Sequence, residues 1–284
     1  MEHLDPMPPE LVVAERAARA GGEVAARSFR GGVASRLKDD GRPSYNLVTE
    51  ADLEAERAIV AEILRAYPDH AVLGEELHGG GRDSGSAVTA EHLWVVDPID
   101  GTSNYFHGIP HFGVSVAYYR AGVPTCGVVG NPVRDDWFLA ARGRGAWHQG
   151  RRVRVSPSER LDEVLIGFGY YYDRGEMMEA TLAAVGDLLR RQIHGVRRMG
   201  AATLDLAYVG LGCFGAFFEY QLAPWDHAAG RLFVEESGGT VTTCRGEPLG
   251  LETTSVLASN GKLHPAVLEI VAAYHPPRRP GSRP

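Results

Sequence analysis

The 284-residue sequence has few cysteines and no long hydrophobic run. Its three cysteines, Cys126, Cys213 and Cys244, are far apart and form no Cys-x-x-Cys pair. This pattern excludes a disulfide framework or a cysteine zinc site and indicates a reducing compartment. The uncharged stretch 206–218 is too short and too rich in glycine to span a membrane, and the first ten residues lack the apolar core of a secretory signal. We therefore expect a cytoplasmic protein with no membrane partner.

The sequence also lacks an excess of basic residues. Asp and Glu number 36 against 29 Lys and Arg, which gives a net charge of −7. A surface that follows the phosphates of a nucleic acid needs a basic patch, so the charge argues against a nucleic-acid partner. A small anionic substrate remains compatible, because bound cations can reverse the sign of the local field.

Hydrophobic periodicity divides the chain into an N-terminal α+β half, residues 1–155, and a C-terminal α/β half, residues 156–275, followed by a disordered tail, 276–284. In the first half we expect two helices, over 10–29 and 51–66. Its expected strands form a mostly antiparallel sheet and cover 71–74, 93–96, 112–119, 125–129, 137–141 and 153–155. In the second half, strands over 164–168, 216–218 and 256–258 alternate with helices over 176–193, 201–209, 226–237 and 265–273. Polar, glycine-containing loops are expected over 38–44 and 78–87.

The strongest motif is the segment LWVVDPIDGTSN, residues 93–104. An apolar strand ends at Asp97 and the chain turns at once, so Asp97 and Asp100 should emerge at the end of a strand. Gly101 permits a close backbone approach, and the three polar residues after it are types that open helices. A helix that begins there would present free N–H groups to an anion such as phosphate. Alone, however, the segment could be a tight turn followed by a helix cap.

Two carboxylates beside a bound anion repel each other and the anion. A divalent cation held by oxygen ligands, most simply Mg²⁺, would relieve both repulsions. Two further acidic segments occur: Glu75-Glu76 after a short apolar run, and Asp226 at the start of a later helix. Individually they are typical of a solvated turn and a helix cap. Together with the first motif they predict a cation cluster.

These three segments, with HGVRRMG at residues 194–200, resemble the signature elements of the inositol monophosphatase family. That family also includes fructose-1,6-bisphosphatases, histidinol-phosphate phosphatases and 3′-phosphonucleotide phosphatases. The resemblance extends from Asn46 to about Gly239. It implies a layered αβαβα sandwich of mixed α+β and α/β class, a homodimer, two or three Mg²⁺ ions per active site and inhibition by Li⁺.

The resemblance also implies roles for individual residues. The metal ligands would be Glu75, Asp97, the main-chain carbonyl of Ile99, Asp100 and Asp226. The catalytic set would be Asp52, Thr102 and Glu75, with Asp52 and the Thr102 hydroxyl orienting the attacking water. Asp52 also fits a capping box with Thr49, and both roles stay open.

The family likeness places the substrate on Gly101, Thr102, Ser103, Ala202 and Glu219. Backbone N–H groups of the first residues would hold the phosphate, and the Glu219 carboxylate would accept hydrogen bonds from polyol hydroxyls. The sequence departs from the family at Gly215, where many members carry aspartate. Lys38 is not assigned, because extra residues at 41–44 blur the alignment.

The expected function is hydrolysis of a small polyol or sugar phosphate, with inositol monophosphate as first choice, by direct attack of a metal-activated water. Histidinol phosphate and fructose 1,6-bisphosphate are the alternative substrates within the family. A phosphatase of the haloacid-dehalogenase type is disfavoured, because it would need two aspartates two residues apart and Asp97 and Asp100 are three apart. A non-catalytic regulator that binds a phosphorylated metabolite is the alternative from another class.

Overall fold

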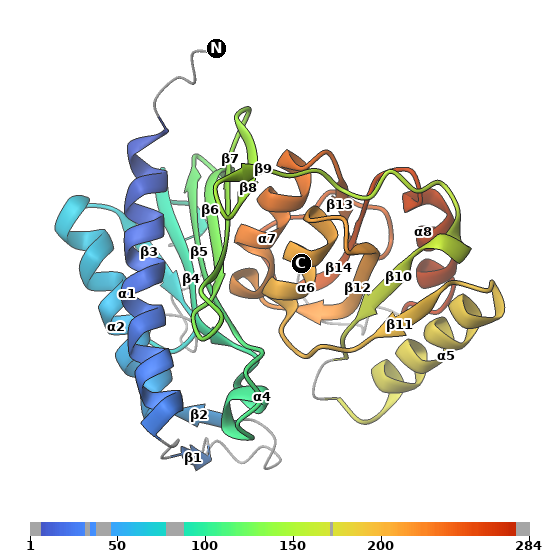
Figure 1. Ribbon diagram of the computed structural model, residues 1–284, viewed down its shortest axis with the longest axis horizontal. Coiled ribbons are helices and arrows are strands. Elements are labelled where there is room, and N and C mark those ends of the chain that lie inside the picture. Colours follow the sequence, from blue (N-terminus) through green and yellow to red (C-terminus); the bar gives the residue numbers. More distant parts are fainter. Residues whose placement is uncertain (1–6, 32–34, 38–46, 78–87, 171–172, 277–284) are drawn as a thin grey trace.

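The computed structural model describes residues 7–31, 35–37, 47–77, 88–170 and 173–276, without side chains at 35–37 and 47–49. Figure 1 shows alternating layers: helices, a sheet, helices, a second sheet and helices. The helices of these layers are α1 (Pro9–Gly31) and α2 (Glu50–Ala66), α6 (Ala202–Gly210) and α7 (Pro224–Glu236), and α5 (Glu176–Arg190) and α8 (His264–Ala273). The expected αβαβα sandwich is confirmed.

The first sheet has seven strands, which neighbour one another in chain order. They are β3 (Ala71–Gly74), β4 (His92–Asp100), β5 (Gly113–Arg120), β6 (Val123–Asn131), β7 (Asp136–Ala141), β8 (Gly145–His148) and β9 (Arg151–Arg152). All pairs are antiparallel except β3 with β4. The predicted strand over 153–155 is wrong: its alternating Val-Arg-Val pattern is strand-like, but the Val155 N–H leaves the sheet and donates to the Ser237 carbonyl.

Strand β4 is buried on both faces, which explains the uninterrupted apolar run at 93–96. Trp94 and Val96 pack in the cluster under α1 and α2. Leu93 and Val95 point the other way, into the cluster shared with α6 and α7. Because side chains alternate along a strand, Asp97 continues the second row and faces α6 and α7.

The second sheet has five strands in the order β11 (Gly195–Arg197), β10 (Leu165–Phe168), β12 (Phe214–Leu222), β14 (Thr254–Ser259) and β13 (Thr240–Thr242). Strand β10 is parallel to both of its neighbours, and β14 is antiparallel to β12 and β13. The two edge strands are three residues long, too short for their periodicity to be recognised in the sequence. A further antiparallel pair joins β1 (Ser35–Leu37) to β2 (Leu47–Thr49), and a 3₁₀ turn, η1, covers Leu161–Glu163.

Helices α6 and α7 lie between the sheets and pack on both (Figure 1). Leu204 and Phe233 contact the seven-stranded sheet, whereas Leu206 and Val234 contact the five-stranded sheet. The boundary near residue 155 stays a prediction. The predicted loops at 38–44 and 78–87 and the tail from 277 lie outside the described residues. None of the helices in the described ranges is both long and apolar enough to cross a membrane.

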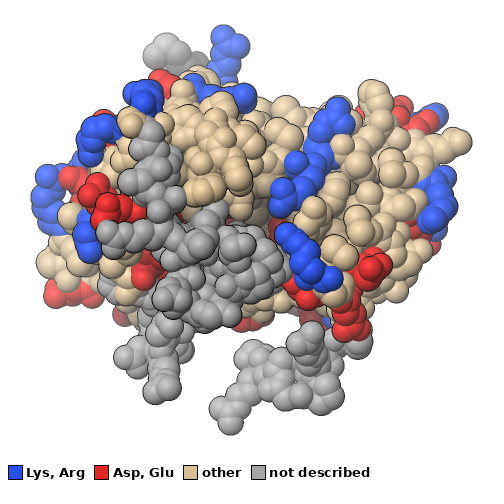
Figure 2. Space-filling model, turned by 90° about the horizontal axis from the view of Figure 1, so that it is seen from below, with Lys and Arg blue, Asp and Glu red and all other residues tan. Residues whose placement is uncertain are grey.

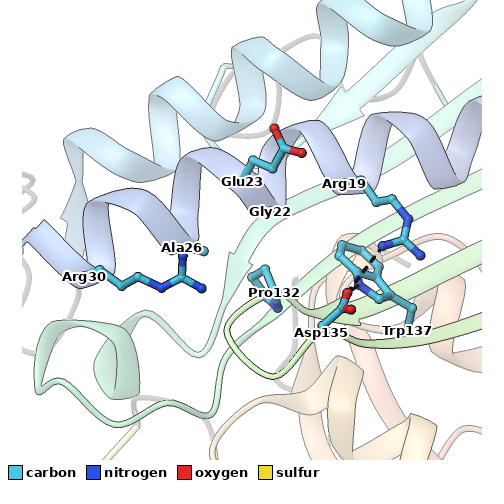
Figure 3. A pocket seen from close by; sticks show the side chains of 8 residues that line it. All are labelled: Arg19, Gly22, Glu23, Ala26, Arg30, Pro132, Asp135 and Trp137. Carbon is cyan, nitrogen blue, oxygen red and sulfur yellow. Dashed lines mark hydrogen bonds and ion pairs between the residues drawn. The ribbon is translucent and has the colours of Figure 1, made fainter. Parts of the chain in front are cut away.

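A cavity of about 220 Å³ lies between α1 and the β6–β7 turn (Figure 3). The Arg19 guanidinium lies 4.6 Å from the centroid of the Trp137 ring and 3.5 Å from Asp135, which also accepts the Trp137 indole N–H at 2.8 Å. Arg30 and Glu23 also line the cavity, so the positive and negative charges on its wall offset each other. The described residues that line this cavity include none of the predicted active-site residues.

Candidate metal centre

Three carboxylates meet where β4 ends and α7 begins. One potential ligand atom each from Asp97, Asp100 and Asp226 lies within 4.8 Å of the others, and among the described residues this is the group found with such spacing. Asp97 and Asp100 come from the end of β4, and Asp226 comes from the first turn of α7. The structure thus brings together three of the predicted metal ligands.

A bulge in β4 turns Asp100 to the same side as Asp97. Residues three apart on a regular strand point to opposite faces. Here Asp97 pairs with Ser115 and Asp100 with Gly113, so three steps along β4 match two along β5. The extra residue falls at Pro98-Ile99, and it directs both carboxylates toward α6 and α7. The main chain of Ile99 lies in this bulge, where its N–H donates to Asp97 Oδ1 at 3.1 Å.

Thr203, in the first turn of α6, holds the Asp100 carboxylate. Its N–H and its hydroxyl both donate to Asp100 Oδ2, at 2.7 Å and 2.6 Å. Gly113 makes room for this contact, because a Cβ there would lie 2.5 Å from Thr203 Oγ1. Sequence reasoning missed Thr203. The available signal was a hydroxyl residue directly after Ala202, at the start of the predicted helix 201–209.

Asp226 caps a helix and also belongs to the group of three carboxylates. Its Oδ2 accepts the Ala223 N–H at 2.7 Å, so this carboxylate caps the first turn of α7. The same carboxyl belongs to the group of three. A helix cap therefore fixes the position of a candidate metal ligand.

The charges of the group repel one another. Burial raises the pKa of Asp97 well above its usual value, and the charges of Glu75, Asp100 and Asp226 raise it further. Burial raises the pKa of Asp100 to about 6, against the lowering effect of the Thr203 hydrogen bonds. Burial and the charge of Asp100 raise the pKa of Asp226 to about 7. A cation between them would reverse each of these charge effects.

A buried oxygen also points to a cation. Asp97 Oδ2 is buried and has no hydrogen-bond partner among the described residues. Such a group normally has a partner, because desolvation without one costs free energy. Carboxylate and carbonyl oxygens are the ligands that Mg²⁺ prefers. The residues of this site therefore fit a hard divalent cation.

Two more predicted residues border this group. Glu75 follows β3, is partly buried, and does not belong to the group of three carboxylates within 4.8 Å. Its charge nevertheless raises the pKa of Asp97 more than the charge of Asp100 does. Asp52 is fully buried in the first turn of α2. Its charge raises the pKa of both Asp97 and Tyr105, which places it beside the end of β4.

The turn after Asp100 is fixed by glycine. Gly101 has φ = +88°, and a Cβ there would lie 2.9 Å from the Gly200 carbonyl oxygen. The expected helix begins at Thr102 as α4 (Thr102–Phe106), but it has only five residues, so its macrodipole is small. The Thr102 hydroxyl donates to the Ile99 carbonyl at 3.1 Å, and Ser103 is partly buried in the first turn.

Asn104 ties α4 to the second half of the chain, a role that the sequence did not reveal. Its side-chain N–H groups donate to the carbonyls of His111 and Met199, each at 2.8 Å. Met199 immediately precedes Gly200, whose carbonyl faces Gly101. The candidate phosphate-binding turn is therefore held against the chain just before α6.

The predicted substrate residues Ala202 and Glu219 lie in α6 and β12, and both are buried. Burial raises the pKa of Glu219 well above its usual value, and Asp226 and Asp205 contribute further. Asp205, which the sequence analysis did not identify, is itself buried with a raised pKa, first because of burial and then because of Asp100. At Gly215, a Cβ would lie 2.6 Å from Val164 Cβ, so Val164 fills the space that a side chain would need.

Comparison with known proteins adds independent findings. The chain matches the inositol monophosphatase family over residues 8–275. Nus factor SuhB of Pseudomonas aeruginosa is 43% identical over 274 residues, 95% of this chain and 98% of that protein. Inositol-1-monophosphatase of Rhizobium meliloti is 38% identical over 254 residues, 88% of this chain and 91% of that protein. A solved IMPase/NADP phosphatase complexed with Mg²⁺ and phosphate has a TM-score of 0.77 at 26% identity, and the match covers 92% of this chain and 94% of that chain.

The names of these relatives differ in kind, since one denotes a Nus factor and the others denote phosphatases. The net charge of the chain does not distinguish a Nus factor from a phosphatase, because a net charge averages over the whole surface. Figure 2 shows a row of Lys and Arg side chains on the lower face of the molecule despite the net charge of −7. The absence of a nucleic-acid partner therefore stays a prediction.

Proposed function

This chain belongs to the inositol monophosphatase family, and we propose that it is a Mg²⁺-dependent phosphatase that hydrolyses a small polyol or sugar phosphate. Inositol monophosphate is the first candidate substrate. The observation that carries the proposal is the meeting of Asp97, Asp100 and Asp226, from two distant segments, within 4.8 Å. A cation site needs closely spaced carboxylates that repel one another, and here the buried Asp97 Oδ2 has no hydrogen-bond partner among the described residues.

We propose that these three carboxylates hold the cations together with Glu75 and the main-chain carbonyl of Ile99. Two or three Mg²⁺ ions would occupy the site. Bound Mg²⁺ would supply Lewis-acid stabilisation of charge on the phosphate and on the leaving oxygen. The hydrogen bond from the Ala223 N–H to Asp226 and the bulge that contains Ile99 would keep these ligands in place before the ion arrives.

Two residues would orient the attacking water. Asp52 is buried next to the end of β4, and the Thr102 hydroxyl already points to the Ile99 carbonyl, at the edge of the same site. Backbone N–H groups of Gly101, Thr102 and Ser103 would hold the phosphate, since the first N–H groups of a helix have no intrahelical partner. The remainder of the substrate would lie against Ala202 and Glu219.

The test is release of inorganic phosphate from a panel of inositol, histidinol and sugar phosphates, with and without Mg²⁺. Asp97→Asn should lower kcat/KM by at least about a hundredfold, because it removes a negatively charged ligand of the cations that would stabilise the transition state. Asp69→Asn, at an exposed position, is the matched control and should leave the rate unchanged. Turnover by Asp97→Asn within a few-fold of wild type would refute the proposal.

Two properties that the family resemblance implies are part of this proposal. We expect homodimers, which sedimentation would detect, and inhibition by Li⁺, which would compete for a weakly held cation position. Activity that is insensitive to millimolar Li⁺ would contradict the second expectation.

A second candidate function comes from the 43% identity to a protein named Nus factor SuhB. The chain would then have a role that does not require phosphate release. Expression of wild type and of Asp97→Asn in P. aeruginosa lacking its own SuhB would separate the two. Complementation by both versions would favour the second function, and complementation by wild type alone would tie the role to the carboxylate site.

A further inference from the structure

Glu56 is a buried carboxylate that hydrogen-bonds to one short turn. It lies in α2, is fully buried, and follows Asp52 by four residues, so both carboxylates lie on one face of the helix. Its Oε2 accepts the Glu76 N–H at 2.7 Å, and its Oε1 accepts the Leu77 N–H at 3.0 Å. These two amides directly follow Glu75.

The same carboxyl group also contacts the residue before Glu75. A Cβ at Gly74 would collide with Glu56 Oε1, so the carboxyl lies directly against the Gly74 backbone. Glu56 therefore touches the main chain on both sides of Glu75. Since β3 ends at Gly74, strand pairing no longer fixes the chain from Glu75 onward, and this carboxylate replaces it.

We propose that Glu56 is a positioning residue that sets Glu75 as a ligand of the cation site. The inference rests on the proposed function, because it takes Glu75 to be a ligand. Helix α2 would then place two parts of the site as one rigid piece: Asp52 directly, and Glu75 through the Glu56 carboxylate. This explains why an acid is buried one turn after Asp52, at a position where an apolar residue would otherwise continue the packed face of the helix.

The chemistry of the contact requires a carboxylate. Two N–H donors converge on it, and an ionised carboxylate is a side chain with two acceptor oxygens and no donor. Hydrogen bonds to an ionised acceptor are the stronger kind. A glutamine has one acceptor and one NH₂ group, so one backbone amide would face a donor and lose its bond.

The experiment measures Mg²⁺ binding by calorimetry, without substrate, so it does not depend on turnover. Glu56→Gln should weaken one class of sites about 10- to 100-fold and leave the tightest site unchanged, as outer contacts of metal ligands do. The matched control is Glu62→Gln, on the same helix, where the carboxylate is partly exposed and pairs with Arg16. It should change Mg²⁺ affinity by less than about twofold, because surface ion pairs contribute little.

A double-mutant cycle separates positioning from a general structural role. If Glu56 acts through Glu75, then Glu56→Gln should cause no additional loss of Mg²⁺ affinity in a Glu75→Gln background. Additive losses, or a variant that unfolds more easily but binds Mg²⁺ like wild type, would overturn the inference. Should Glu56→Gln fail to fold, Gly74→Ala tests the same contact, because its methyl group would displace the Glu56 carboxyl.

The outcomes also distinguish this inference from the proposed function. A wild-type protein that binds Mg²⁺ with the expected cycle but releases no phosphate would contradict the phosphatase proposal and support the role of Glu56. An active phosphatase with independent effects at residues 56 and 75 would do the reverse. A wild-type protein that binds no Mg²⁺ would overturn both.

Discussion

Replacing Asp100 with asparagine should stabilise the protein when no metal is bound. The substitution preserves shape, and the asparagine Oδ1 can still accept both Thr203 hydrogen bonds. It removes one negative charge from a group in which three carboxylates lie within 4.8 Å. The new NH₂ group could in addition donate to Asp97 or Asp226.

The magnitude follows from the pKa of Asp100. Burial raises it from 3.8 to about 6. Each pH unit of difference corresponds to about 1.4 kcal/mol, so ionising Asp100 in the folded state costs about 3 kcal/mol. Below about pH 4 the carboxyl is protonated in both states and this penalty is absent. As the pH rises toward 6, the unfolded chain loses the proton first, so the free energy of unfolding falls, and above pH 6 the full penalty is present.

The assay is urea unfolding of wild type and Asp100→Asn in EDTA, at about pH 4 and about pH 8. The variant should be more stable by up to about 3 kcal/mol at the higher pH, roughly 5 to 10 °C in Tm, and similar to wild type at the lower pH. Saturating Mg²⁺ should reverse the order, because it stabilises the wild type more. A variant that is no more stable than wild type in EDTA at about pH 8 would refute the reasoning.

Three further predictions concern neighbouring residues. Thr203→Val keeps the shape of the side chain but loses the hydroxyl hydrogen bond to Asp100, so it should lower Mg²⁺ affinity about tenfold in calorimetry. Thr203→Ser keeps the hydroxyl and should bind Mg²⁺ with nearly wild-type affinity. Equal losses of affinity in both variants would argue against a role of the hydroxyl. Glu219→Gln should raise KM for a polyol phosphate about tenfold in phosphate-release assays with little change in Mg²⁺ affinity, and the opposite pattern would place Glu219 in the cation site instead. Gly101→Ala should lower the free energy of unfolding by about 1–3 kcal/mol in urea titrations, because residue 101 has a positive φ and the new methyl group would collide with the Gly200 carbonyl. Gly122→Ala is the control: residue 122 also has a positive φ, but no atom of the described residues lies close to the added methyl group. Its free energy of unfolding should fall by less.

Much of the architecture followed from local patterns. The apolar run 93–96 predicted a buried strand, and helical spacing predicted α1, α2, α5 and α8. These features were readable because burial of a face imposes a period on the sequence. Short edge strands such as β11 and β13 were not readable, since three residues show no period.

The candidate site divides in the same way. Asp97, Asp100 and Asp226 were found from the sequence because their acidic segments occur together in one chain and resemble a known family. Thr203 and Glu56 were not found. Their significance comes from the groups that they contact across the fold, Asp100 for Thr203 and the amides after Glu75 for Glu56.

The sequence by itself determined which side chains this protein has available for a cation and which segments would carry them to the ends of strands and helices. Only the tertiary structure decided that they meet. The bulge at Pro98-Ile99 turns Asp100 to the side of Asp97, and the packing of α7 between two sheets brings in Asp226, which lies 126 residues further along the chain than Asp100. The physical reason is that charge repulsion and metal affinity depend on distances in space, and those distances are set by the packing of residues that contribute no chemistry themselves.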